Sequence, residues 1–332
     1  MAQVTTPAQE QTVWQRALAA ARGIPAIYVV FILLFLGVGY LNPSFLEPSG
    51  FFNFLRRAAP LAILTAGQLF VIVSGGFDLS VGSLMSLMVI GASLFINNDP
   101  ANTWWAIMVL FAIGAAVGVL NGVLVAYFKV PSLIATLGML LVLRGVGLYW
   151  TGGAPRGYLT ENFRIFGRGW LDPVPLVERL PYAAVVLIVV TVIAYYIFHQ
   201  TNFGRQVLAV GDNPVAAELS GVKVSRVRIV AFVVSALSAV IAGILQGGIG
   251  GVNPEAGTGF ELQAISAAVL GGAVLLGGRG SVPTAITGAL ALEALFTLLN
   301  LLGLPKPLRD AIQGLIIIGA VAYAAITGRR RN

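Results

Sequence analysis

Few side chains in this 332-residue chain could carry out covalent chemistry. The chain has no cysteine and a single histidine, His199, which excludes a disulfide, a thiolate metal site and a cluster of histidine ligands. It contains no Gly-x-x-x-x-Gly-Lys-[Ser/Thr] loop, no His-Glu-x-x-His pair and no Gly-x-Ser-x-Gly turn. The sequence therefore predicts no cofactor, no metal and no catalytic site, and we expect the chain not to be an enzyme.

Polar side chains inside or beside long apolar runs are the next candidates for a function. Asp78 in "GGFDLSVGS" is placed to cap the following helix or to line an inner gate. Glu293 in "GALALEALFTLLN" is placed to pair within a helix bundle or to line a pore. Gln68, Asn121 and Asn300 suit hydrogen bonds between helices or contacts with the hydroxyl groups of a small polar solute. These five residues are our candidates for a gate or translocation path.

The composition shows what kind of element must position these residues. The chain is 58% hydrophobic and only 10% charged, whereas a soluble domain carries roughly 25% charged residues. Its 40 glycines suit closely packed membrane helices. The net charge of +7 comes from basic residues scattered at the ends of apolar runs, which fits membrane orientation and predicts no nucleic-acid partner.

Ten windows are long enough to cross a hydrocarbon core of about 30 Å. They cover residues 24–41, 57–75, 83–98, 104–126, 131–150, 182–198, 229–249, 261–277, 283–302 and 308–327. The 83–98 and 261–277 windows are short enough to be broken or partly re-entrant, so nine to eleven spans fit the pattern. The predicted fold class is all-α, a polytopic helical membrane protein with about ten transmembrane helices.

Basic clusters indicate the orientation and divide the chain. "KVSRVR" (223–228) and "GRRRN" (328–332) are typical of the cytoplasmic side, so we predict that both termini are cytoplasmic. The chain then consists of a cytoplasmic N-terminal arm (1–23), a transmembrane domain (24–327) and a basic C-terminal tail (328–332). The first apolar run lacks a small-residue cleavage site and is predicted to remain as an anchor.

Two long loops follow from this orientation. Residues 151–181, rich in glycine, proline and aromatic residues, are predicted to face outward, and residues 199–228 to face the cytoplasm. Arg144 in "LVLRG" lies near the outer end of its span. There it can reach the lipid headgroups, pair with an acidic group or take part in translocation.

The cytoplasmic loop contains a short helix whose ends are marked in the sequence "DNPVAAELSG". Asp212 or Asn213 can accept a hydrogen bond from the first free N–H groups, and Pro214 suits the first helical position. Gly221 can adopt the left-handed conformation that ends a helix. A helix of this length is marginal on its own and needs a partner surface.

The same helix is expected to have a small apolar face formed by Val215, Ala216 and Leu219, with Glu218 directed away from it. One possible partner is the membrane, because the basic residues of 223–228 would meet anionic lipid headgroups. The other is a protein surface. The local sequence leaves both open.

Four stretches in series resemble one family of transport proteins. They are "VSGGFDLSVGSLMSL" (73–87), "LIATLGMLLVLRGVGLYWTGG" (133–153), "GDNPVAAELSGV" (211–222) and "AGTGFELQAISAAVLGGAVLLGGRGS" (256–281). In order and spacing they are similar to the permease subunits of bacterial ABC-type sugar importers, above all the group for ribose, rhamnose and the furanose-like signal autoinducer-2.

The resemblance implies that the chain is the permease of an ATP-driven sugar importer in the bacterial cytoplasmic (inner) membrane. It implies pairing with a second permease copy or a sister permease, and separate ABC ATPase subunits that perform the hydrolysis. An extracytoplasmic sugar-binding protein would deliver the sugar. In such importers the ATPases grip a short cytoplasmic coupling helix of each permease. The matching positions here are Asn213, Pro214, Ala216, Ala217, Glu218 and Gly221.

One position departs from the general pattern, and two other functions stay open. Many importer permeases have Glu-Ala-Ala and, after three further residues, Gly; here Ala216, Ala217 and Gly221 match while Val215 replaces the Glu. An importer of another small solute, such as a branched-chain amino acid, would share much of this architecture. A stand-alone ion-coupled transporter would need a mid-span carboxylate, for which Glu293 is the candidate. The "GGFDLSVG" motif favours the sugar group.

Overall fold

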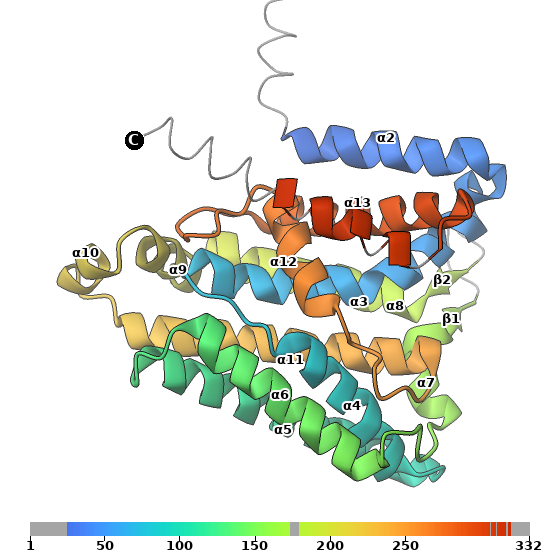
Figure 1. The fold of residues 1–332 in the computed structure, drawn as a ribbon, viewed down its shortest axis with the longest axis horizontal. Helices are drawn as coiled ribbons and strands as arrows, with labels where there is room; N and C mark the ends of the chain where they lie inside the picture. The colour runs from blue at the N-terminus through green and yellow to red at the C-terminus, as the bar shows by residue number, and fades with distance from the viewer. Residues whose placement is uncertain (1–24, 173–178, 306, 310, 317, 320–332) are drawn as a thin grey trace, which may run out of the picture.

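The computed structural model describes residues 25–172, 179–305, 307–309, 311–316 and 318–319. In this part of the chain nearly all regular structure is helical (Figure 1). The helices are α2 (Ala26–Leu41), η1 (Pro43–Leu46), α3 (Pro48–Val73), α4 (Val81–Ile96), η2 (Pro100–Asn102), α5 (Thr103–Ala126), α6 (Ser132–Thr151), α7 (Glu161–Arg168), α8 (Tyr182–Tyr195), η3 (Tyr196–Gln200), α9 (Asn202–Asp212), α10 (Pro214–Leu219), α11 (Val224–Gly250), α12 (Phe260–Leu270) and α13 (Val282–Leu301). Strands β1 (Trp170–Leu171) and β2 (Leu180–Pro181) pair antiparallel.

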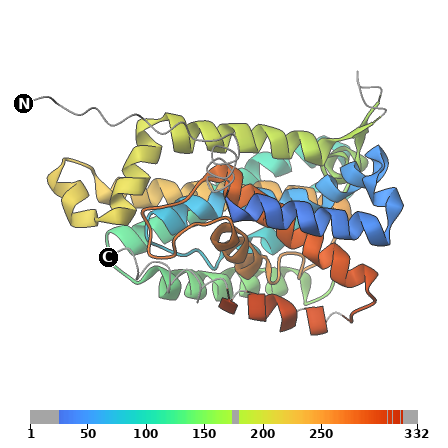
Figure 2. The same ribbon diagram turned by 90° about the horizontal axis from the view of Figure 1, so that it is seen from above.

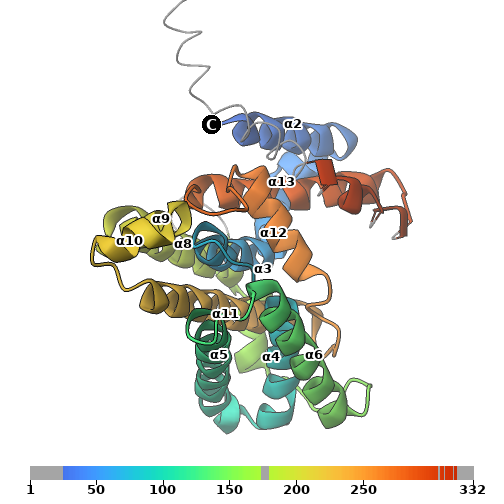
Figure 3. The ribbon, with the colours of Figure 1, turned by 60° about the vertical axis from the view of Figure 1, so that its left-hand side comes forward.

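The long helices run between two ends of the bundle. Helices α9 and α10 project from one end, which we call the α10 end (Figures 1 and 2). Helix α7 and the β1–β2 pair lie at the opposite end, the α7 end. Helix α11 occupies the centre, with α4, α5 and α6 on one side of it and α3, α13 and α2 on the other (Figure 3).

Six helical segments of the described chain are long and apolar enough to cross a membrane. They are Pro48–Val73, Pro100–Ala126, Ser132–Thr151, Tyr182–Gln200, Val224–Gly250 and Val282–Leu301. Three further apolar helices, α2, α4 and α12, are shorter. The prediction of an all-α polytopic membrane protein is therefore confirmed. The arm 1–23, the tail 328–332 and part of the 308–327 window lie outside the described residues.

Several predicted boundaries are wrong. Helix α3 begins at Pro48 rather than near residue 57, because its first turns carry polar and basic residues that lower their hydropathy. The 199–228 loop contains a second helix, α9, whose N-terminus is capped by the Thr201 side chain. The loop 151–181 likewise contains α7, which the sequence analysis did not predict. All three segments are too polar or amphipathic to be found by a search for apolar runs.

The expectation that the 261–277 window is interrupted is confirmed. Helix α12 has 11 residues, about 16 Å of helix, which is too short to cross the membrane. It ends where Gly271 packs on the backbone of Thr284 and Ala285 and where Gly272 has a φ of +87°. Helix α4 is also short because residues 74–80 are not helical. The bundle thus contains two partial helices, α4 and α12.

Glycine spacing explains the close contact between α5 and α11. Gly114, Gly118 and Gly122 recur every four residues and so share one face of α5. A Cβ atom at Gly118 would lie 2.7 Å from the Cα of Val233, and one at Gly122 would lie 2.7 Å from the Cα of Ile229. Small residues at this spacing let two membrane helices approach at backbone distance. This contact holds α5 against the central helix.

Gly211→Ala tests a second close approach, at the α10 end. A Cβ atom at Gly211 would overlap the carbonyl oxygen of Val73 and press on the backbone of Gly278. We expect a loss of about 2 kcal/mol in the free energy of unfolding, as for other overpacked sites. Thermal unfolding of the detergent-solubilised protein measures this loss. Gly138→Ala is the control, because that position has open space around it; equal melting temperatures for the two variants would contradict the prediction.

Candidate functional site

The helix predicted in the loop 199–228 is present as α10, and its ends are set by the expected residues. The side-chain Oδ1 of Asn213 accepts a hydrogen bond from the Ala216 N–H at 3.0 Å, and Pro214 occupies the first helical position. Gly221 has a φ of +84° directly after the C-cap residue, Ser220. Asn213, not Asp212, is the capping residue, because Asp212 is the last residue of α9.

The apolar side chains of α10 lie uncovered in the described chain. Val215 is 66% exposed and Leu219 is 86% exposed, whereas Ala217 on the opposite face is 5% exposed. Glu218 is also exposed. Ala217 therefore anchors the helix to the rest of the protein, and Val215, Ala216 and Leu219 form an outward apolar surface. We call these three residues the α10 face.

Asn213→Ala is expected to loosen α10 without disturbing the membrane helices. Loss of the N-cap hydrogen bond costs about 1 kcal/mol, which a six-residue helix cannot replace from elsewhere. The amides of residues 216–220 should then exchange with deuterium several-fold faster, about tenfold for 1.4 kcal/mol. Hydrogen exchange with mass spectrometry measures this rate. Unchanged exchange would show that tertiary contacts alone hold α10.

Three of the predicted polar candidates meet in one buried cluster. Gln68 on α3, Asp78 before α4 and Asn121 on α5 are each 0% exposed. Ser80 and Ser235 connect them. Asp78 Oδ1 accepts hydrogen bonds from the Ser80 N–H at 3.0 Å and the Ser80 hydroxyl at 2.6 Å, and Oδ2 accepts one from the Ser235 hydroxyl at 3.1 Å. The Asn121 amide donates to the Ser80 hydroxyl at 2.9 Å.

This cluster fixes the non-helical segment 74–80 to its neighbours. The expectation that Asp78 caps the next helix is wrong, because its carboxylate accepts from Ser80, the residue before α4, and not from the first turn of α4. Asp78 instead makes an Asx-type turn and a hydrogen bond to Ser235 on the central helix α11. The geometry indicates a role in positioning the start of α4.

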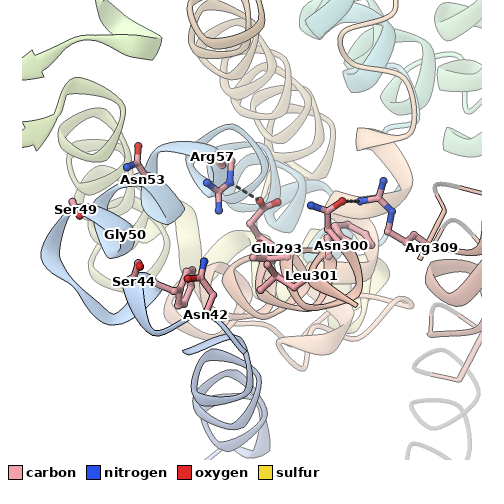
Figure 4. A pocket seen from close by; sticks show the side chains of 13 residues that line it. Asn42, Ser44, Ser49, Gly50, Asn53, Arg57, Glu293, Asn300, Leu301 and Arg309 are labelled. Atoms are coloured by element: carbon pink, nitrogen blue, oxygen red, sulfur yellow. Dashed lines mark hydrogen bonds and ion pairs between the residues drawn. The ribbon is translucent and has the colours of Figure 1, made fainter. Parts of the chain in front are cut away.

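The remaining two candidates, Glu293 and Asn300, lie elsewhere, beside a cavity at the α7 end (Figure 4). Glu293 Oε1 lies 3.7 Å from Arg57 Nε, so the predicted partner within the bundle is present. Asn300 Oδ1 accepts a hydrogen bond from Arg309 Nη1 at 3.0 Å. The cavity has a volume of about 650 Å³. Its other polar lining residues are Asn42, Ser44, Ser49, Asn53 and Thr297.

Several residues of these sites were missed by the sequence analysis. Arg57 and Arg309 were not among the sequence candidates, although a basic residue within an apolar helix signals a buried partner. Ser235 carries no local signal that distinguishes it from other serines in membrane helices. Among the described residues, no three His, Cys, Asp or Glu side chains gather as a metal site.

Comparison with known proteins places this arrangement in a family. Residues 50–321 match the family described as "Branched-chain amino acid transport system / permease component". The match covers both partial helices, the buried cluster, α10 and Glu293. The chain belongs to this permease family. It is a transport component rather than an enzyme, and a multi-pass protein of the bacterial cytoplasmic membrane.

Individual relatives of the permease are similar over most of their length. The ribose import permease protein of Escherichia coli (strain K12) is 36% identical over 296 residues, covering 88% of this chain and 91% of that protein. The ribose import permease protein of Bacillus subtilis (strain 168) is 38% identical over 297 residues, with 88% and 89% covered. The autoinducer 2 import system permease protein of Enterobacter sp. (strain 638) is 35% identical over 322 residues, with 96% and 88% covered. No solved structure gave a significant match.

Proposed function

We propose that this permease forms the membrane path of an ABC-type importer for a ribose-like sugar and that α10 is its coupling helix. The main support for the coupling role is the α10 face, which belongs to a capped helix with exposed apolar side chains at one end of the bundle. An exposed apolar surface of this kind suits protein docking. Separate ATPase subunits would grip Asn213, Pro214, Ala216, Ala217, Glu218 and Gly221 there.

The proposed orientation puts the α10 end in the cytoplasm. Lys223, Arg226 and Arg228 lie near that end, as the positive-inside rule requires. The α7 end, with the loop 151–181 and the Glu293 cavity, would then face outward and receive the sugar-binding protein. Ten spans with both termini in the cytoplasm fit this arrangement, as do an N-terminal arm at 1–23, a permease domain at 24–327 and a tail at 328–332.

Coupling in this proposal is a shift between two states of the permease. Closure of the ATPases on bound ATP would move α10, and α9 would carry the movement to the ends of α3 and α11, which it contacts. Nucleotide shifts such an equilibrium only by its differential affinity for the two states, tenfold for about 1.4 kcal/mol. A second permease, identical or related, would form the other half of the path, with membrane lipid around both.

The cargo is proposed from the relatives and the motif "GGFDLSVG". Several curated relatives are named for the import of ribose, autoinducer 2 or galactose and methyl galactoside. The family description mentions branched-chain amino acids, which is the second candidate cargo. An ion-coupled transporter is disfavoured because Glu293, its required carboxylate, is paired with Arg57.

Uptake by the native bacterium tests the cargo directly. Disruption of this gene should abolish energised uptake of labelled ribose, rhamnose or autoinducer 2, whichever is the cargo, and leave leucine uptake unchanged. Restoring the gene should restore uptake. The proposal fails if leucine uptake is lost and all sugar uptake persists. It also fails if the sugar is taken up without ATP by this chain alone.

A further inference from the structure

A charged pair lies on the exposed side of α6. Arg144 Nη2 on α6 lies 3.7 Å from Glu255 Oε1, and the two side chains are 57% and 66% exposed. Arg144 lies seven residues before Thr151, the last residue of α6, or about 10 Å below that end. Exposed charges at this depth are costly in lipid and normally face a protein or a water-filled path.

The same face lacks a neighbour between Gly138 and Leu148. Gly138 and Gly145 on α6 have open space where a side chain would be. Leu141 and Leu148, one turn from these glycines, are exposed. Within the described chain, nothing covers this strip of α6. This face combines the Arg144–Glu255 pair with small and apolar residues, a combination that fits contact with a second permease along the path better than it fits acyl chains alone.

Next to the charged pair is a narrow hollow lined by both polar and apolar residues. It lies between α4, α6 and the segment that leads into α12, and its volume is about 70 Å³. Hydroxyl and carboxylate groups converge on it from Ser83, Ser86, Thr258 and Glu261, beside Arg144 and Glu255. These are the groups that bind the hydroxyls of a sugar. Because ligand pockets usually measure 300–1,000 Å³, the hollow in one chain is at most part of a site.

Two partial helices begin at this hollow. Helix α4 starts at Val81 and α12 at Phe260. Their starts touch, because a Cβ atom at Gly82 would collide with the Glu261 carboxylate and would lie 2.6 Å from the Gly257 carbonyl oxygen. The Gly257 N–H also donates to the Ser86 hydroxyl at 2.8 Å. Interrupted helices that begin within the membrane commonly build the substrate site of a transporter, and their N-termini carry partial positive charge.

We propose that this hollow is one half of a narrow, polyol-binding part of the translocation path, and that a second permease completes it. We call this part of the path the waist. Ser83 and Glu261 contact the hydroxyls of the passing sugar, and the Arg144–Glu255 pair closes the waist toward the α7 end. The inference rests on the proposed sugar transport. It adds Ser83, Glu255 and Glu261, which belong neither to the sequence candidates nor to the Glu293 cavity.

Cysteine labelling tests the path, since the chain has no native cysteine. In the assembled transporter in membranes, Ser83→Cys should react with a hydrophilic thiol reagent. Ribose at ten times its binding constant should slow the reaction about tenfold by occupancy. Ser93→Cys, on the same helix but 0% exposed, should not react. Absence of labelling at Ser83→Cys, or labelling that ribose does not slow, overturns the proposal.

Transport kinetics test the contact itself. Glu261→Gln keeps the shape of the side chain, and we expect KM for ribose to rise about 10- to 100-fold, the range for a hydrogen bond to a charged group. For the deoxy-ribose that lacks the contacted hydroxyl, the same substitution should raise KM much less than it does for ribose. Thr191→Val on α8 is the control and should leave KM unchanged, because the Thr191 hydroxyl donates to the Leu187 carbonyl of its own helix.

The proposal of a sugar-binding waist is overturned if Glu261→Gln leaves KM unchanged, or if the substitution raises KM equally for ribose and for every deoxy-ribose. Failure of the proposed function is distinguishable, because it would appear in the wild-type transporter as an absence of ribose-type uptake. Failure of the waist would appear only in the variants, with wild-type uptake intact.

Discussion

Leu219→Asp is expected to abolish ATP-driven uptake while the permease stays folded. Leu219 is 86% exposed on the α10 face, so the substitution removes few contacts within the chain. If ATPase subunits dock there, the change places a charge where an apolar anchor was buried. Anchors of this kind contribute about 2–4 kcal/mol, so the ATPase should bind at least about 30-fold more weakly.

The measurement is affinity purification of the detergent-solubilised permease with its ATPase, followed by titration of the two purified proteins. Leu302→Asp is the matched control, because Leu302 is 58% exposed just beyond the end of α13 at the α7 end. It should bind ATPase as the wild type does. Both variants should show the melting temperature of the wild type.

Equal ATPase affinity for Leu219→Asp and wild type would contradict the coupling role of α10. The alternative would then be an interfacial helix on the cytoplasmic headgroups, held by the basic residues of 223–228. That alternative predicts a different result. A peptide covering residues 211–228 would bind vesicles containing anionic lipid, and Leu219→Asp would weaken this binding. Added salt would weaken it further.

Asp78→Ala is expected to have the largest effect on stability of any single substitution in the buried cluster. It removes the acceptor for three hydrogen bonds, two from Ser80 and one from Ser235. The Ser235 hydroxyl keeps Gln68 Oε1 as an acceptor at 3.4 Å, but both Ser80 donors lose their partner. A buried donor without a partner costs about 1–3 kcal/mol, so the loss should be at least about 2 kcal/mol. Segment 74–80 would also lose its attachment to α11, and α4 would no longer start at a defined place.

Thermal unfolding in detergent measures the stability loss, and uptake in membranes measures the functional one. Asp99→Ala is the control. The Asp99 carboxylate accepts one exposed hydrogen bond, from the Ala101 N–H at 2.9 Å, so its loss should cost no more than about 1 kcal/mol. Asp78→Asn should fall between the two, because the amide keeps one acceptor oxygen. Equal melting temperatures for Asp78→Ala and Asp99→Ala would show that the cluster does not hold segment 74–80.

Local sequence was sufficient to predict α10 to within one residue at each end. Its start depends on Asn213 and Pro214 and its end on Gly221, and the hydrogen bond and dihedral angle involved act within three or four residues. Apolar runs located the membrane helices because a run of apolar residues is also a local property of the sequence. The amphipathic helices α7 and α9 were missed because a search for apolar runs does not detect them.

The grouping of polar residues was decided only by the tertiary structure. Ser235 is 157 positions from Asp78 and 167 from Gln68, so no local pattern indicates that they meet. The five sequence candidates looked alike as polar groups in apolar runs, yet three lie in a buried cluster and two beside a cavity at the α7 end. The hollow between α4 and α12 depends on contact between Gly82 and Gly257. Such contacts form only when the packed helices bring distant segments together, which is why residue type identified candidates while packing assigned their partners.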